Sequence, residues 1–268
     1  MPGSVTDSNP SRNRRASWTC FLIHIIGRNA PAPTVIRSVR VVPVSGRTID
    51  RRRHPEAERP DVGLRCAHDR GWGYRIERLS AETWPAFAAL VERQSGLFTG
   101  CWCTNFHCYP DPPERREIGN RAFKERLVRD GRAHAALVFD GAEAIAWAQY
   151  GSVEELPAIH HRKEWERTVE QIPDVRITCV FVDRRCRKSG LAEVAVRGAL
   201  ALIAEDGGGR VESYPHDIPE GKKMSSSFLY NGTRTMYERI GFDYDRPKGA
   251  GNCVMTVVVG PPKRRRPG

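Results

Sequence analysis

Residues 176–182 read Arg-Ile-Thr-Cys-Val-Phe-Val, and residues 187–192 read Arg-Lys-Ser-Gly-Leu-Ala. The first run predicts a short buried strand, the second a basic turn that contains glycine, and the apolar spacing after the turn predicts a helix. Backbone N–H groups and a helix N-terminus would then point at one small volume, which suits a phosphate or pyrophosphate. Many phosphate binders share this arrangement, so the turn predicts an anion site without identifying its ligand.

The rest of the chain predicts one α/β domain built on a mixed sheet. Alternating apolar residues predict strands, apolar residues three and four apart predict helices, and Asp140-Gly141 predicts a tight hairpin turn. The expected strands are residues 74–79, 133–139, 143–150, 175–182, 211–214 and 253–259. The expected helices are residues 81–93, 114–129, a helix from 191 that glycines 207–209 end, and 227–240. Residues 154–171 predict a short helix or an irregular excursion.

Positive charge is concentrated at the two ends of the chain. The net charge is +11, of which residues 1–73, with 13 arginines and 6 acidic residues, hold +7, and residues 263–266 hold +4. Residues 74–262 contain 26 basic and 26 acidic residues. Since runs of like charge are usually solvated, we expect a basic, disordered extension at residues 1–73 and a basic tail at 261–268. The neutral core argues against nucleic-acid binding by the domain itself.

The cysteines and the apolar segments predict a cytoplasmic protein. Eight cysteines are spread along 268 residues without the pattern of a disulfide scaffold, so reduced thiols are expected. Residues 14–26 place arginines before a short apolar stretch, as a signal peptide does, but His24 and the shortness of the stretch oppose export. No run of about 18 apolar residues occurs, and no membrane association is expected.

Two segments together resemble the acetyl-CoA-dependent GNAT acyltransferase superfamily. Residues 187–192 fit its Gln/Arg-x-x-Gly-x-Gly/Ala pyrophosphate loop, and residues 236–242, Met-Tyr-Glu-Arg-Ile-Gly-Phe, fit the Leu-Tyr-Glu-Lys-x-Gly-Phe ending of its late helix. The resemblance covers about residues 74–259 in element order and 175–259 in motif detail. It implies a domain at residues 74–260 with a central, mixed, mostly antiparallel sheet that is flanked by helices and splayed between its two central strands.

The resemblance also implies a binding site for acetyl-CoA as cosubstrate. Backbone groups of the strand before the loop would pair with the pantetheine arm, and the loop N–H groups would hold the pyrophosphate, with Gly190 allowing close approach. The family's asparagine lies seven residues before the tyrosine of the late helix. Here Tyr230 occupies that position and Asn231 follows one place late. The implied cofactor-binding residues are Val180, Phe181, Val182, Arg187, Lys188, Ser189, Gly190, Leu191, Ala192 and Asn231.

The implied reaction is transfer of an acetyl group to a primary amine by direct attack in a ternary complex. Tyr237 occupies the position of the family's tyrosine, whose hydroxyl can protonate the departing thiolate, although an aromatic residue there would also serve the core. For the base, Asp183, Glu212 and His216 lie at or just beyond the ends of the two central strands. The predicted catalytic residues are Tyr237, Asp183 and Glu212. The acceptor is not readable from the sequence.

A cluster of cysteines lies between the first two expected helices. Cys101, Cys103, His107 and Cys108 are four possible zinc ligands within eight residues, but a single Cys-x-Cys does not easily close a tetrahedron with its own neighbours, and no metal is expected. Trp102, Phe106 and Tyr109 either shape the acceptor pocket or pack the loop. A thioester on Cys101 or Cys103 is chemically accessible, but the resemblance favours direct transfer.

Other functions remain open at this stage. The chain could be a catalytically degenerate CoA-binding protein with a regulatory role, or a nucleic-acid-associated protein that uses its Arg-rich termini. The sequence also leaves open a homodimer.

Overall fold

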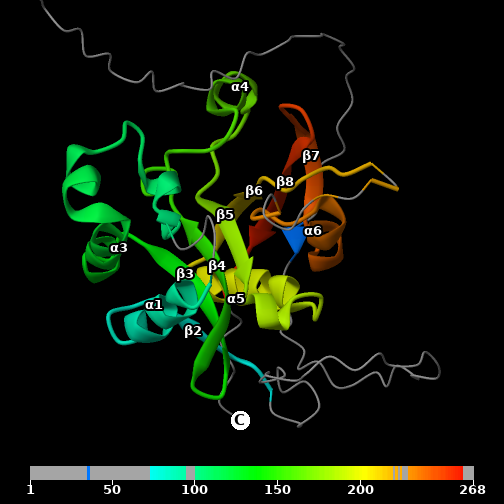
Figure 1. The fold of residues 1–268 in the computed structure, drawn as a ribbon. Coiled ribbons are helices and arrows are strands. Elements are labelled where there is room, and N and C mark those ends of the chain that lie inside the picture. The colour runs from blue at the N-terminus through cyan, green and yellow to red at the C-terminus, as the bar shows by residue number, and fades with distance from the viewer. Residues whose placement is uncertain are drawn as a thin grey trace, which may run out of the picture. The chain divides into compact units, whose positions relative to one another are not determined.

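One open, mixed sheet carries the domain, in the strand order β1-β8-β6-β5-β4-β3-β2 with β7 paired to β8 (Figure 1). The computed structural model describes residues 35–36, 73–94, 100–219, 221–222, 224 and 229–261, all within one compact unit. The strands are β1 (Val35–Ile36), β2 (Arg75–Arg78), β3 (His134–Asp140), β4 (Glu143–Gly151), β5 (Val175–Val182), β6 (Gly209–Ser213), β7 (Asp243–Lys248) and β8 (Asn252–Val259).

The helices pack on both faces of the sheet. They are α1 (Trp84–Glu92), α3 (Pro113–Arg129), α4 (Arg162–Thr168), α5 (Leu191–Glu205) and α6 (Arg234–Ile240), with short 3₁₀ turns at Asn105–His107 and Arg184–Cys186. One buried cluster joins α5 and α6 to the sheet, and a second joins α1 and α3 to the opposite face. The predicted α/β class and the splayed, mostly antiparallel sheet are confirmed.

Glycine and threonine residues lie at the ends of α5 and α6. Helix α5 ends at Asp206, where Gly208 N–H donates to Ile203 O and the Gly208 backbone has φ +82°. A Cβ at Gly208 would lie 2.1 Å from the Val259 carbonyl oxygen, so this close approach to β8 requires glycine. Thr233 caps the N-terminus of α6, where its hydroxyl accepts from Met236 N–H, and Gly241, with φ +109°, caps the C-terminus.

Three features differ from the sequence expectation. The predicted helix at 227–240 starts only at Arg234, because residues 229–233 run as an irregular segment. Strand β7 was missed, since its residues Asp-Tyr-Asp-Arg-Pro-Lys are polar and contain proline, which is confined mainly to edge strands. Strand β1 lies in the segment for which disorder was predicted. Apart from these two residues and Gly73, the predicted extension at 1–73 lies outside the described residues, as does most of the tail.

Helix α4 lies inside the predicted excursion and covers the end of the sheet that carries β6 and β8. Its Trp165 packs with Ile159, Tyr214 and Val254 in a small buried cluster. No helix in the described segments is long and apolar enough to cross a membrane.

Candidate functional site

The two central parallel strands separate after three residue pairs. Val175, Arg176 and Ile177 of β5 pair with Val211, Glu212 and Ser213 of β6. Beyond this point β5 continues to Val182 beside β4, whereas the chain leaves β6 at Ser213. The two strands therefore diverge at their carboxyl ends, and the gap lies between residues 178–182 and residues 214–216. Parallel α/β proteins commonly bind ligands at such a divergence.

The basic turn follows β5 directly and ends at the N-terminus of α5. Gly190 caps the helix with φ +81° and ψ 0°, and Lys188 also has a positive φ of 65°. Within the described part of the chain, no acceptor is bonded to the backbone N–H of Gly190, Leu191 or Ala192. The side chains of Arg187 and Lys188 are exposed beside these groups. The N–H donors, the positive end of the α5 dipole and two cationic residues thus lie within six consecutive residues, 187–192, and an anion site combines such groups.

Other residues of the turn are engaged within the protein. The Ser189 hydroxyl donates to the Cys186 carbonyl, and Arg187 Nε lies 3.5 Å from the Val182 carbonyl oxygen. Phe181 is buried against Trp147, with ring centroids 4.4 Å apart. The side chains of Ser189 and Phe181 are therefore used in contacts within the turn and the strand.

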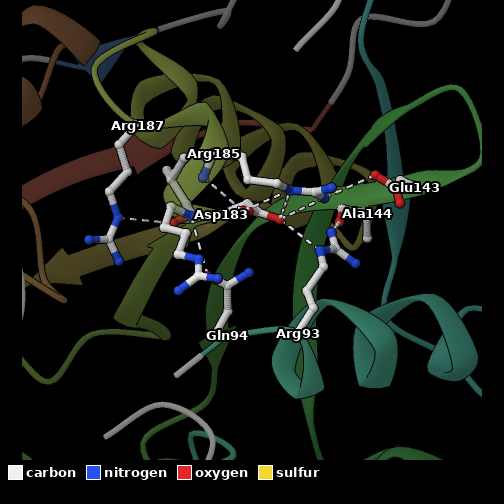
Figure 2. A network of polar contacts seen from close by, with 9 residues as sticks. Arg93, Gln94, Glu143, Ala144, Asp183, Arg185 and Arg187 are labelled. Carbon is white, nitrogen blue, oxygen red and sulfur yellow. Dashed lines mark hydrogen bonds and ion pairs between the residues drawn. The ribbon is translucent and has the colours of Figure 1, made fainter. Parts of the chain in front are cut away.

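Asp183 is the centre of a polar network at the end of β5 (Figure 2). Its carboxylate accepts from Arg93 Nε at 2.7 Å, from Arg185 Nη2 at 2.9 Å and from Arg185 N–H at 2.9 Å. Although burial alone would raise the pKa of Asp183, hydrogen bonds from Arg185 and Arg93 outweigh it and hold this pKa well below its usual range. Asp183 thus joins α1 to the turn as a permanent anion, and its low proton affinity argues against the predicted role as a base.

Glu212 is fully buried on β6 beneath α4. Its Oε2 accepts from Trp165 Nε1 at 2.7 Å and from the Tyr214 hydroxyl at 3.0 Å. Its Oε1 lies 3.7 Å from Arg246 Nη2 and is hydrogen-bonded to none of the described residues. Arg176, the register partner of Glu212, stacks its guanidinium 4.1 Å from the Trp165 ring centroid. The surroundings of Glu212 are structural: one oxygen accepts two hydrogen bonds, and Arg246 lies beside the other.

Tyr237 lies on the α6 face that packs under the divergence of the strands. The residue is 0% exposed, and its ring meets Phe242 edge to face at 4.9 Å. Burial raises the pKa of Tyr237, and Ser213, at the last paired position of β6, lowers it. The Tyr237 hydroxyl lies near Ser213 without an acceptable hydrogen bond to any described residue. A buried hydroxyl at the divergence, near Ser213 and not hydrogen-bonded to the residues that the structure describes, is consistent with the predicted acid.

Residues 229–233 bridge the gap between the two strands. Val180 N–H donates to the Tyr230 carbonyl oxygen at 2.6 Å, and His216 N–H donates to the Gly232 carbonyl at 3.1 Å. Asn231 is 5% exposed and its Nδ2 donates to the Tyr214 carbonyl at 3.1 Å. Asn231 therefore anchors this segment to β6. The predicted pantetheine partner Val180 uses its N–H within the chain.

Aromatic and imidazole rings surround Tyr230 on the side of the sheet covered by α1 and α3. The centroid of the Tyr230 ring lies 5.8 Å from that of His160, 6.1 Å from that of His216 and 6.1 Å from that of Phe106. Of the loop aromatics, Phe106 thus reaches the gap, whereas Trp102 is buried against Trp84. Sequence reasoning missed His160 and the role of Tyr230, because these contacts join segments far apart in the chain.

The cysteine cluster lies on the same face. Cys103 Sγ is 3.0 Å from Cys179 Sγ of β5, and the buried Lys124 Nζ lies 2.9 Å from His107 Nε2. In the described residues, no group of three or more His, Cys, Asp or Glu side chains could hold a metal ion.

No protein-family model matches the chain, and no curated protein matches it. Solved structures similar to it include the ribosomal-protein-S18-alanine N-acetyltransferase from Escherichia coli, with 11% identity, a TM-score of 0.37, and coverage of 73% of this chain and 99% of that one. Another is the PaiA N-acetyltransferase from Thermoplasma acidophilum in complex with coenzyme A, with 11% identity, a TM-score of 0.39, and coverage of 70% and 99%. A third is the GNAT family N-acetyltransferase YhbS from Escherichia coli in complex with CoA, with 15% identity, a TM-score of 0.40, and coverage of 76% and 86%. At these identities and scores, the neighbours carry no inference about acceptor or mechanism.

Proposed function

We propose that this chain is an acetyl-CoA-dependent N-acetyltransferase. The observation that carries the proposal combines two neighbouring features. Strands β5 and β6 diverge, and the basic turn beside them leads into α5, with its backbone N–H groups at the N-terminus of that helix. The turn would hold the pyrophosphate through N–H groups of residues 190–192 and the charges of Arg187 and Lys188. The acetyl thioester would enter the gap, and backbone N–H groups of β5 would polarise its carbonyl.

The chemistry would be direct attack of a primary amine on the thioester carbonyl. The new C–N bond forms as the C–S bond breaks, and the CoA thiolate takes a proton from Tyr237. Support for Tyr237 is its position at the divergence and its hydroxyl, which forms no hydrogen bond with any residue that the structure describes. Because Asp183 is held by two arginines, Glu212 is the better candidate of the two carboxylates for accepting the amine proton.

Binding and turnover are tested separately. Acetyl-CoA should raise the thermal midpoint of the full chain, because a ligand that binds only the folded state stabilises it. Release of CoA thiol in the presence of amines, aminoglycosides or peptides would then identify the acceptor class. An unchanged thermal midpoint at saturating acetyl-CoA would refute the proposal that acetyl-CoA is the cosubstrate. A shift without thiol release for any amine would favour a CoA-binding protein without transferase activity.

A further inference from the structure

Lys124 is a buried cation surrounded by thiols. The residue is 1% exposed, and its Nζ donates to Gln149 Oε1 at 2.6 Å and contacts His107 Nε2 at 2.9 Å. Its charge acts on four nearby thiols, those of Cys103, Cys179, Cys101 and Cys108. No carboxylate in the described part of the chain forms an ion pair with Lys124. A hydrogen bond from Cys101 lowers the pKa of Cys103, but the contact with Cys179 and burial raise it above its usual range, and the charge of Lys124 acts against that rise.

Two of these thiols are almost at bonding distance. Cys103 comes from the turn before the 3₁₀ helix and Cys179 from the middle of β5, yet their sulfurs are 3.0 Å apart. Both residues are thiols, with exposures of 3% and 2%. A disulfide needs a sulfur separation of about 2.05 Å, so closing the bond requires a movement of about 1 Å. Cys101, which is half-buried, interacts with Cys103 through its thiol.

We propose that Cys103 and Cys179 form an oxidisable pair, which a peroxide converts into a disulfide that ties the turn at 101–108 to β5. The pair is a modification site distinct from the acetyl-transfer chemistry, and it does not depend on that chemistry. Since β5 borders the gap between the central strands, the crosslink would fix this strand to the turn that carries Phe106.

The reaction balances with hydrogen peroxide as the oxidant. The Cys103 thiolate attacks one peroxide oxygen, the O–O bond breaks, and hydroxide leaves and takes up the thiol proton as water. The Cys179 sulfur then attacks the sulfenic sulfur of Cys103, the S–O bond breaks, and a second water leaves with the proton of Cys179. Two thiols lose two electrons and two protons, and one peroxide becomes two waters.

The test is a peptide map of the full chain after oxidation. Native protein is treated with increasing hydrogen peroxide, quenched with catalase, unfolded, alkylated, digested and analysed by mass spectrometry. We expect a peptide pair that joins Cys103 to Cys179 and is released by dithiothreitol. Cys253 is the control, because it is also a buried thiol but contacts a carbonyl and no other described sulfur, with its Sγ 3.8 Å from the Pro215 carbonyl oxygen. Cys253 should remain alkylatable.

Variants separate the pair from general thiol reactivity. Cys103→Ala and Cys179→Ala should each abolish the crosslink, whereas Cys253→Ala should leave it unchanged. Lys124→Met should slow its formation about threefold for each pKa unit by which the attacking thiol rises, since the tenfold smaller thiolate fraction is partly offset by higher nucleophilicity. Crosslinks that join Cys101 instead, sulfinic acid without a crosslink, or a crosslink that forms equally in unfolded protein would overturn the proposal.

Discussion

Replacing Gly190 by alanine distinguishes two properties of the turn. One is the free-energy cost of a side chain on a backbone with positive φ, and the other is the role of the turn in holding a pyrophosphate. Gly190 has φ +81°, where an L-residue pays about 1–2 kcal/mol, and alanine recovers about 0.4–1 kcal/mol by restricting the unfolded chain. A Cβ at this position would meet no protein atom within 4 Å. The expected net loss of stability is therefore about 1 kcal/mol and carries no steric contribution from the protein itself.

The effect on acetyl-CoA binding should be much larger than this cost. At a ligand concentration of about 100 times Kd, the wild-type chain gains roughly 2.7 kcal/mol. If the methyl group weakens pyrophosphate binding about a hundredfold, the gain at the same concentration falls to about 0.4 kcal/mol. Denaturant unfolding with and without acetyl-CoA measures both quantities for each variant.

Gly131→Ala is the matched control. Gly131 also has a positive φ, of 66°, and a Cβ there would also meet nothing within 4 Å, but it lies in the turn after α3. The two variants should lose similar stability without ligand, and only Gly190→Ala should lose the stabilisation by acetyl-CoA. If Gly190→Ala kept the wild-type gain within about 0.5 kcal/mol, the assignment of the pyrophosphate to this turn would be refuted.

Three further variants test the buried ionisable groups. Tyr237→Phe should lower turnover about a hundredfold while acetyl-CoA affinity stays within twofold, because the hydroxyl forms no hydrogen bond with the described part of the protein. Steady-state kinetics and ligand titration check this, and unchanged turnover would exclude the acid role. Asp183→Asn should cost on the order of 3 kcal/mol by urea unfolding, against about 0.5 kcal/mol for the exposed Glu143→Gln. Because the folded-state pKa of Asp183 is lowered, its contribution is complete above pH ~4 and is lost as the pH falls below that value. Burial lowers the pKa of Lys124 to about 8, so the unfolded chain binds more protons at this residue between pH 8 and about 10.4, and the contribution of Lys124 to stability should rise by about 3 kcal/mol across this window. Burial also lowers the pKa of Lys248 to about 8, so Lys124→Met should reduce the rise by that amount relative to wild type without abolishing it, and an unchanged rise would contradict the pKa of Lys124.

The local parts of the fold could be predicted from the sequence. The basic turn, α5 and the end of α6 form because of apolar spacings within about a dozen residues and because of Gly190 and Gly241. These features are local, so the sequence pattern alone predicts them. The splay was expected from the resemblance and not from the strands, whose composition does not say where two neighbours part. Strand β7 depends on pairing with β8, which its polar sequence does not indicate.

The roles of buried polar groups could not be predicted, because they depend on contacts across the chain. Asp183 forms an ion pair with Arg93, 90 residues earlier, and this pairing makes the Asp183 carboxylate a weaker base. Cys103 and Cys179 are 76 residues apart in sequence and 3.0 Å apart at their sulfurs. A charged or nucleophilic residue type thus indicates what a side chain can do, but the partner that decides its protonation comes from another element.

The hydrogen bond from Val180 to Tyr230 bears directly on how a thioester could enter the gap. An unpaired N–H on a buried strand is costly, so the ligand-free chain pairs Val180 N–H with the Tyr230 carbonyl. If the pantetheine arm pairs with Val180, it replaces one backbone carbonyl by another acceptor, and the net change in hydrogen bonding is close to zero. If the contacts of Asn231 with Tyr214 and of Gly232 with His216 are kept in this exchange, only the peptide of Tyr230 needs to turn away. The same movement would shift the Tyr230 ring from His160 and His216, and cosubstrate binding would thereby change the surface that an acceptor amine meets.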